Sequence, residues 1–180
     1  MKKTEKKVEF KSPKSTDENP RLPVIFAPWR NSYIKRDQSL KGCVFCDGLK
    51  KGVSFESLIV YSAKTCSIFL NKFPYNNGHL LVIPHRHTPD LASLNKEEFN
   101  ELHEVLLKAH SAIIKSHNPQ GINIGLNLGR AAGAGIIDHL HYHLVPRWSG
   151  DTNFMPIIGG TKVISEELEQ TYNKLLPLLV

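Results

Sequence analysis

Three short segments in the first half of the chain have the apolar, β-branched composition of strands. They are residues 57–62 (SLIVYS), 66–71 (CSIFLN) and 79–84 (HLLVIP). Polar residues separate them, and KFPYNNG between the second and third has the composition of a turn. The first two segments are close enough in sequence to form a hairpin.

A longer pattern, with apolar residues every three or four positions, predicts a helix from Asn95 to about residue 116. Asn95 can cap this helix, and Glu98 stands three residues later, where a capping box requires it. The apolar positions that would face the core are Phe99, Leu102, Leu106, Ala109 and Ile113.

The second half of the chain has two more strand-like segments and a second helix. Residues 122–127 (INIGLN) are followed by the glycine-rich LGRAAGAG and then by the strand-like HLHYHLV. The stretch VISEELEQTYNKLLPLL predicts a C-terminal helix, with Ser165 as its cap and Pro177 disrupting it near the end. This order of elements indicates an antiparallel sheet with helices packed on it, hence an α+β fold.

Length and composition predict one domain, since 180 residues with 41% hydrophobic content bury one substantial core. The first twenty residues hold six lysines and four acidic residues without apolar periodicity, which predicts a flexible basic tail over 1–20 and a single domain over 21–180. We expect residues 20–35 to be extended over that domain. The absence of a long apolar run or a signal-type segment predicts a cytoplasmic protein that does not cross a membrane.

Three histidines, His139, His141 and His143, alternate along HLHYHLV. In a strand their side chains would share one face at a spacing of about 7 Å, because successive side chains point to opposite faces. Imidazole accepts, donates or attacks near neutral pH, so this density of histidines favours phosphate chemistry or metal binding over packing.

A second constellation is the Cys43-x-x-Cys46 pair, which is either half of a metal site or a redox motif. A redox motif needs a thioredoxin-like context that GCVFCDGLKKG does not provide, so metal is favoured once two further ligands are found. Candidates are His85, His87 and one member of the histidine run, and spacing does not choose among them. Cys66, in an apolar strand, fits a small buried residue.

Glycines precede the histidine run at Gly129, Gly133 and Gly135. Backbone N–H groups beside glycine can approach an anion closely. A neutral imidazole held through one nitrogen presents the other as a nucleophile toward an activated phosphate. Together these features predict transfer of a phosphoryl or nucleotidyl group.

The run HLHYHLV resembles the signature of the histidine triad (HIT) family of nucleotidyl hydrolases and transferases, over roughly residues 33–163. The stretches GLNLGRAAGAG, PRWSGDTNFMP and TKVI are similar to the bacterial diadenosine tetraphosphate (Ap4A) phosphorylase branch more than to the nucleoside phosphoramidase branch. The resemblance implies an antiparallel sheet of about five strands with one long helix and a C-terminal helix, assembled as a homodimer. It also implies a nucleotidyltransferase that cleaves Ap4A with inorganic phosphate into ATP and ADP.

The resemblance also implies roles for individual residues. His141 would attack the α-phosphorus and form a nucleotidyl-histidine, while His79 and His143 would contact the α-phosphate. Asn127 would lie beside the scissile phosphate, and Asn71 would contact the nucleoside.

Further along, the resemblance implies that the backbone around Gly133 and Gly135 faces phosphate. Some relatives have a glutamine and a serine where this chain has Gly135 and Ile136, so any contact here would come from the backbone. Trp148, with Phe154, would stack on adenine near the dimer boundary, and ordinary packing is an equally weighted alternative for both.

For the metal, the resemblance implies one answer among the open ligand sets. Zinc-bearing relatives, including galactose-1-phosphate uridylyltransferase, have ligands at positions that correspond to Cys43, Cys46, His87 and His139. His139 would then anchor the nucleophile through a structural Zn²⁺ without touching the substrate.

Other functions remain open at this point. The same residues are compatible with a hydrolase of dinucleoside polyphosphates or nucleoside phosphoramidates. A nucleotide-binding regulatory module with little turnover is a second alternative. Nucleic-acid binding through the basic tail is disfavoured, because its interspersed acids dilute the charge and no element that reads bases is present.

Overall fold

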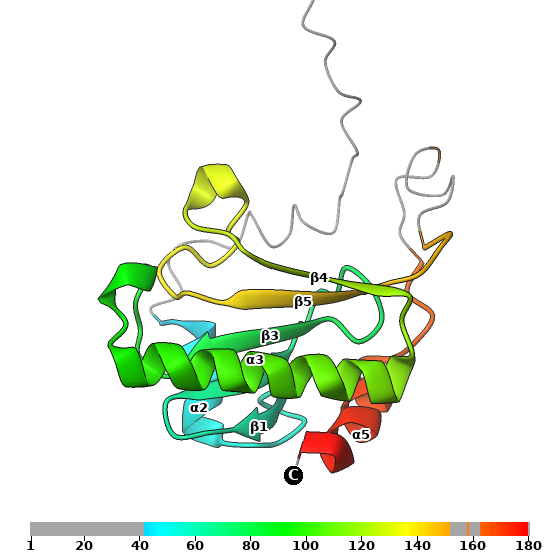
Figure 1. The fold of residues 1–180 in the computed structure, drawn as a ribbon, viewed down its shortest axis with the longest axis horizontal. Helices are drawn as coiled ribbons and strands as arrows, with labels where there is room; N and C mark the ends of the chain where they lie inside the picture. The colour runs from blue at the N-terminus through cyan, green and yellow to red at the C-terminus, as the bar shows by residue number, and fades with distance from the viewer. Residues whose placement is uncertain (1–41, 152–157, 159–162, 180) are drawn as a thin grey trace, which may run out of the picture.

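The computed structural model describes residues 42–151, 158 and 163–179 (Figure 1). The tail over 1–20, the segment over 20–35 and Phe154 lie outside the described residues, so what the sequence predicts for them stays a prediction.

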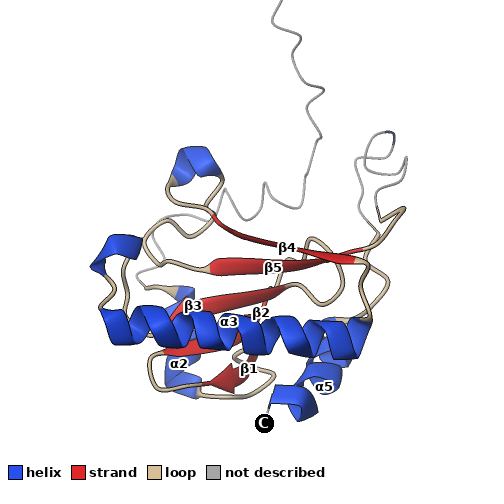
Figure 2. Ribbon diagram, viewed as in Figure 1, coloured by secondary structure: helices blue, strands red, loops and turns tan. Residues whose placement is uncertain are grey.

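The described chain is built on a five-stranded antiparallel sheet with the strand order β1-β2-β3-β5-β4 (Figure 2). The strands are β1 (Ile59–Ser62), β2 (Cys66–Leu70), β3 (Leu80–Pro84), β4 (Gly121–Leu126) and β5 (Tyr142–Arg147). β1 pairs with β2 in the predicted antiparallel hairpin. The predicted α+β fold is confirmed.

Helices cover both faces of this sheet. α3 (Lys96–His117) and α5 (Leu168–Leu179) pack on one face, and α2 (Val44–Lys51) lies on the opposite face (Figure 1). Two 3₁₀ turns, η1 (Leu91–Ser93) and η2 (Arg130–Ala132), lie in the connections. No helix in the described ranges is long and apolar enough to span a membrane.

The inner strands β2 and β3 are buried on both faces, which explains their almost continuous apolar sequences. Leu80 and Val82 of β3 point into the core under α3 and α5, whereas Leu81 and Ile83 pack with Phe45 of α2. The alternation of side chains along a strand therefore assigns each residue to one of two cores.

The long helix α3 begins as its sequence predicts. The Asn95 side chain accepts a hydrogen bond from Glu98 N at 2.9 Å, and the Glu98 carboxylate accepts one from Asn95 N at 2.9 Å. The helix ends at His117, and the C-cap residue Asn118 has a left-handed φ of 43°. The predicted capping box is confirmed.

The predicted start and end of the C-terminal helix are wrong. The helix begins at Leu168, and the Ser165 hydroxyl accepts a hydrogen bond from Asn77 Nδ2 at 2.8 Å instead of capping. Pro177 lies inside the helix, which continues to Leu179. Leu175 and Leu179 are fully buried, so packing stabilises the last turn despite the proline.

The expectation of one strand carrying all three histidines is also wrong in extent. β5 begins at Tyr142, so His139 and His141 precede it. The reason is a long-range contact, because Leu140 N donates to Thr88 O, in the segment after β3, at 2.7 Å rather than to a neighbouring strand. The alternation of faces survives, since the His139 and His141 rings both pack on Phe45.

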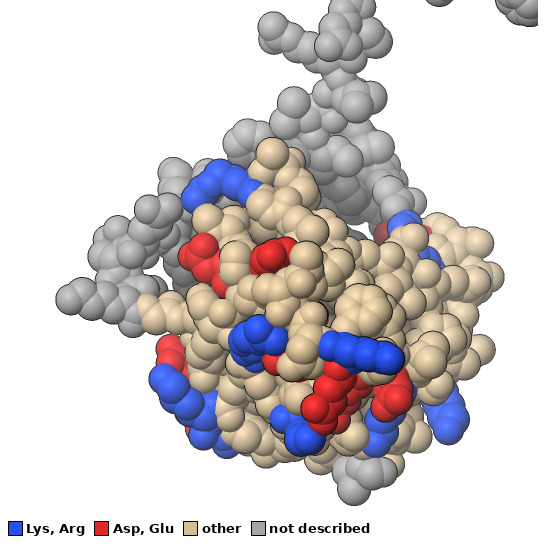
Figure 3. All heavy atoms as spheres, turned by 60° about the vertical axis from the view of Figure 1, so that its left-hand side comes forward, with Lys and Arg blue, Asp and Glu red and all other residues tan. Residues whose placement is uncertain are grey.

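Basic and acidic side chains are interspersed on the face drawn in Figure 3. Ion pairs between elements include Lys64–Glu97 at 2.6 Å and Arg86–Glu98. A mixed surface of this kind produces no single-sign field, so this face gives no support to nucleic-acid binding.

Candidate functional site

The register of the sheet sets the surroundings of His143. Leu81 of β3 and Gly125 of β4 stand directly opposite it on the two neighbouring strands. Residues directly opposite on antiparallel strands share a face. A Cβ added at Gly125 would meet nothing within 4 Å, so the space beside His143 on the β4 side is open.

His141 is held in one protonation state. Its Nδ1–H donates to the His139 carbonyl oxygen at 2.8 Å, and its side chain is enclosed, with 5% of the residue exposed. Burial lowers the pKa of His141, and the backbone hydrogen bond opposes this only in part. The imidazole is therefore neutral near pH 7 with its lone pair on Nε2, as a nucleophile requires.

His79 and His143 form a second histidine pair next to His141. The Nε2 of His79 lies 3.0 Å from Nδ1 of His143, and the His141 and His143 ring centroids are 5.0 Å apart. Asn71 Nδ2 lies 3.3 Å from His79 Nδ1. The structure thus brings together His79, His141, His143 and Asn71, four residues that the sequence predicts to share a site.

The connection from β4 to His139 carries the remaining predicted phosphate contacts. Asn127, half-buried, directly follows β4, and a Cβ at Gly133 would lie 4.0 Å from Asn127 Nδ2. Gly133 has a left-handed φ of 89°, which favours glycine, and Gly135 is exposed in the same connection.

Trp148 is not brought to this cluster. It follows the end of β5, five residues after His143, which corresponds to about 16 Å along a strand. Its backbone N donates to the Asp151 carboxylate at 3.3 Å.

Four donor atoms converge in front of α2, from Cys43, Cys46, His87 and His139, all within 4.8 Å of one another. The distance from Sγ to imidazole Nδ1 is 3.3 Å for Cys43–His139, 3.4 Å for Cys46–His87 and 3.6 Å for Cys46–His139. Tetrahedral bonds of about 2.3 Å to sulfur and 2.0–2.1 Å to nitrogen separate such atoms by about 3.6 Å. The described residues therefore fit a tetrahedral metal ion.

The orientation of His139 supports the same conclusion. Its Nε2–H donates to the Pro84 carbonyl oxygen at 2.8 Å, which leaves Nδ1 unprotonated toward the two cysteines. Burial lowers the pKa of His139, which favours the neutral form that ligates metals.

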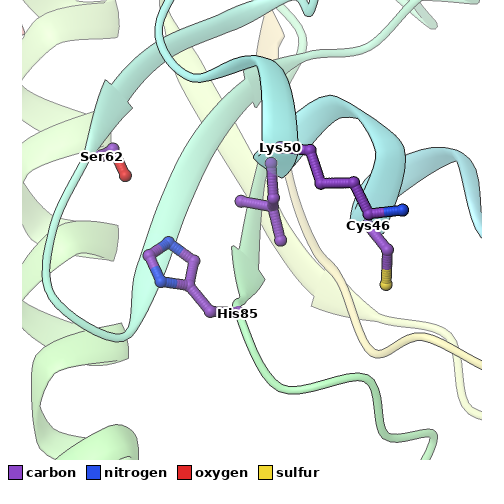
Figure 4. A pocket seen from close by; sticks show the side chains of 5 residues that line it. Cys46, Lys50, Ser62 and His85 are labelled. Atoms are coloured by element: carbon purple, nitrogen blue, oxygen red, sulfur yellow. The ribbon is translucent and has the colours of Figure 1, made fainter.

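His85, the other histidine that spacing left open, is not part of this cluster. Its Nε2 lies 2.8 Å from the Ser67 hydroxyl. It lines a neighbouring pocket of about 330 Å³ together with Cys46, Leu49, Lys50 and Ser62. Figure 4 shows the His85 ring turned toward Ser62 and away from the sulfur of Cys46.

Sequence reasoning missed Phe45, which connects the two histidine groups. Its ring centroid lies 5.5 Å from that of His139 and 5.2 Å from that of His141. α2 approaches the sheet closely because Gly48 has no side chain, and a Cβ there would lie 2.9 Å from the Phe69 ring. The four-residue spacing of two apolar positions in VFCDGLKK was the available signal.

Comparison with known proteins identifies the architecture. The family model described as the HIT domain matches residues 54–150, which is more than half of the chain. The chain belongs to the HIT family. A solved structure titled as a Zn-bound histidine triad family protein from Mycobacterium smegmatis superposes with a TM-score of 0.61 at 28% identity, covering 76% of this chain and 92% of that one.

Two curated relatives carry names that describe an activity. An AP-4-A phosphorylase of Mycobacterium tuberculosis is 47% identical over 116 residues, covering 64% of this chain and 60% of that protein. The asymmetrical bis(5'-nucleosyl)-tetraphosphatase of Schizosaccharomyces pombe is 31% identical over 122 residues, covering 68% of this chain and 63% of that protein. This chain thus spans about three fifths of the length of these relatives.

Proposed function

We propose that this chain is a nucleotidyltransferase that cleaves Ap4A with inorganic phosphate to give ATP and ADP. The observation that carries the proposal is the bare Nε2 of a buried, neutral His141 beside the His79–His143 pair. The 47% identity to the mycobacterial AP-4-A phosphorylase supports the choice of substrate.

The reaction proceeds by two displacements on the α-phosphorus. The lone pair on Nε2 of His141 forms a bond to this phosphorus, the bond to the bridging oxygen breaks, and ATP leaves with that oxygen. An oxygen of inorganic phosphate then attacks the adenylyl-histidine, which releases ADP and restores the neutral imidazole.

The binding residues follow from the same cluster. His143 contacts the α-phosphate, His79 acts on this phosphate through its hydrogen bond to His143, and Asn71 contacts the nucleoside. Asn127 and the backbone near Gly135 approach the phosphates from the open β4 side.

The metal site is proposed to hold zinc with a structural role. Cys43 and Cys46 bring α2 to the metal, His87 brings the segment after β3, and His139 brings the segment before His141. When bound, the ion supplies cross-linking of these three segments and thereby fixes the backbone that carries the nucleophile.

We also propose that two copies of the chain associate through β4. This strand forms one edge of the sheet, so its outer backbone groups have no partner strand within the described chain, and Ile124 on it is 48% exposed. Because Trp148 lies far from His143 in the same chain, its stacking on adenine belongs to the site of the second chain. Light scattering of the purified protein tests the association.

A hydrolase is the second candidate, favoured by the similarity to the tetraphosphatase of S. pombe. Water would then replace inorganic phosphate in the second displacement, and AMP would replace ADP among the products. The histidine geometry supports either acceptor.

The deciding experiment is product identification from Ap4A with ¹⁸O-labelled inorganic phosphate. Phosphorolysis places the label in ADP, whereas an equal rate of AMP release without phosphate would establish the hydrolase instead. His141→Ala should lower kcat by at least about 10⁴-fold. His110→Ala, on α3 across the sheet, should retain activity as the matched control. Binding of Ap4A without measurable turnover in the wild type would favour a regulatory module.

A further inference from the structure

The loop between β2 and β3 surrounds one nitrogen of His79 with donors. The backbone N–H of Tyr75 donates to Nδ1 of His79 at 3.0 Å. Asn71 presents its amide nitrogen 3.3 Å from the same atom. The orientation of that amide is fixed, because its oxygen accepts from Phe73 N at 2.9 Å. Nδ1 of His79 is therefore an acceptor and carries no proton.

A neutral imidazole without a proton on Nδ1 carries it on Nε2. The Nε2 of His79 lies 3.0 Å from Nδ1 of His143, closer than its 3.4 Å separation from Asn71 Nδ2. The proton of His79 is thus donated to His143, whose Nδ1 must be an acceptor as well. By the same rule the neutral His143 carries its own proton on Nε2.

This tautomer means that Nε2 of His143 offers a ligand a hydrogen-bond donor and not an acceptor. Non-bridging phosphate oxygens accept hydrogen bonds, so an N–H on Nε2 attracts them and a lone pair there would repel them. His79 is only 2% exposed, and in such an enclosed place hydrogen bonds are strong and a wrong tautomer is costly.

We propose that the backbone N–H of Tyr75 is a positioning group for the reaction. It fixes the tautomer of His79 and, through the His79–His143 hydrogen bond, keeps the proton of His143 on Nε2. Both imidazole rings remain neutral, and no proton is transferred between them. The use of this proton by a phosphate oxygen rests on the proposed function, whereas the tautomer itself does not.

The Tyr75 ring contacts both histidines independently of the backbone N–H. Its ring stacks on His143 with the planes at 15° and the centroids 5.8 Å apart, and lies 4.6 Å from the His79 centroid. Pro74 precedes it and restricts the backbone that presents the N–H. Removing the N–H and removing the ring are therefore two different perturbations of one residue.

The test replaces Tyr75 with its α-hydroxy acid analogue, which exchanges the N–H for an ester oxygen and keeps the ring. Tyr75→Ala is the matched control, because it removes the ring and keeps the N–H. In the free, metal-loaded full-length protein, two-bond ¹H–¹⁵N imidazole correlations identify the protonated nitrogen of each histidine. We expect Nε2–H on both His79 and His143 in the wild type and in Tyr75→Ala, and a mixture of tautomers in the ester variant.

Kinetics supply the second readout. With Ap4A and phosphate as substrates, the ester variant should lose about tenfold in kcat beyond any loss in Tyr75→Ala. The reason is that His143 then donates a weaker hydrogen bond to the α-phosphate. A wild-type spectrum with the His143 proton on Nδ1 overturns the proposal even if the ester variant does not fold. So does an ester variant with unchanged tautomers. If the wild type does not cleave Ap4A, the proposed function fails, and the spectrum of the free protein still decides on the tautomer.

Discussion

The two sides of the histidine cluster are built differently. On the side of α2, β2 and β3, His139 is fully buried and both of its ring nitrogens have partners, the Pro84 carbonyl and the cysteine sulfurs. On the side of β4, Gly125 and Gly129 face open space. The closed side can fix the reacting nitrogen, and the open side leaves room for a polyphosphate. Substitutions on the closed side should therefore lower stability, whereas substitutions on the open side should change substrate binding.

The largest loss of stability should come from changing the four-residue metal site on the closed side. Cys46→Ala removes one of four ligands, so we expect loss of the bound metal and a decrease of about 4 kcal/mol in the free energy of unfolding. Urea unfolding and metal analysis of the purified protein measure both. Full thermal stability of this variant would contradict a structural role for the metal.

Cys66→Ala is the matched control for this experiment. Burial raises the pKa of the Cys66 thiol to about 12, so it stays protonated and does not ligate metal. We expect a full metal content and a loss of only about 1 kcal/mol from the smaller side chain.

A smaller effect should follow from crowding the turn that carries His79. Gly78 has a left-handed φ of 73°, and a Cβ there would lie 3.1 Å from the His117 ring, which is held by Glu166 at 3.2 Å. Gly78→Ala should cost about 3 kcal/mol, combining backbone strain with this contact. Gly52→Ala isolates the strain, because its φ is 71° and nothing lies within 4 Å of its Cβ position.

The difference between these two variants measures the contact alone. Equal losses in Gly78→Ala and Gly52→Ala would show that the His117 ring moves aside freely. A larger loss of unfolding free energy in Gly78→Ala, with a parallel fall in kcat, would show that the turn carrying His79 is rigidly packed, like the closed side of the histidine cluster.

The next effect depends on pH. Arg147 and then Asn76 donate to the Asp151 carboxylate, at 2.6 Å and 2.7 Å, and these bonds lower the pKa of Asp151 well below its usual range. A depressed pKa stabilises the folded state fully above the unfolded value of about 3.9 and progressively less as the pH falls below it. Asp151→Asn should therefore lower the free energy of unfolding by about 2 kcal/mol at pH 7.

Measuring urea unfolding of Asp151→Asn and the wild type from pH 7 to pH 2.5 tests the sign. The two stabilities should converge below about pH 4. A gap that stays constant over this range would mean that the charge of Asp151 contributes nothing and that only the shape of the side chain matters.

Much of the fold was predictable because burial leaves a strong imprint on sequence. β2, β3 and α3 are enclosed on a face or on both, and their apolar periodicity located each within a residue or two. α2 was missed because its eight residues are too few to repeat the helical period clearly and include Gly48, and in the structure Phe45 of this helix packs on Phe69. The predicted disruption at Pro177 was wrong because the burial of Leu179 outweighs the low helix propensity of proline.

The site divides in the same way. Periodicity placed the histidines on one face, but only the structure separates His87 from His85, since that choice depends on how the chain turns after Pro84. The role of the Tyr75 backbone had no signal in the sequence, because an N–H is present at every residue except proline.

The smallest expected effect probes the open side. Gly125→Ala adds a methyl group beside His143 where nothing lies within 4 Å, so the free energy of unfolding should change by less than about 0.5 kcal/mol. If substrate fills this space, KM for Ap4A should rise while kcat changes little, because the methyl obstructs binding without moving His141. Steady-state kinetics beside urea unfolding separate the two effects. An unchanged KM would show that the polyphosphate avoids β4, and the open side would then have to be sought between Asn127 and Gly135.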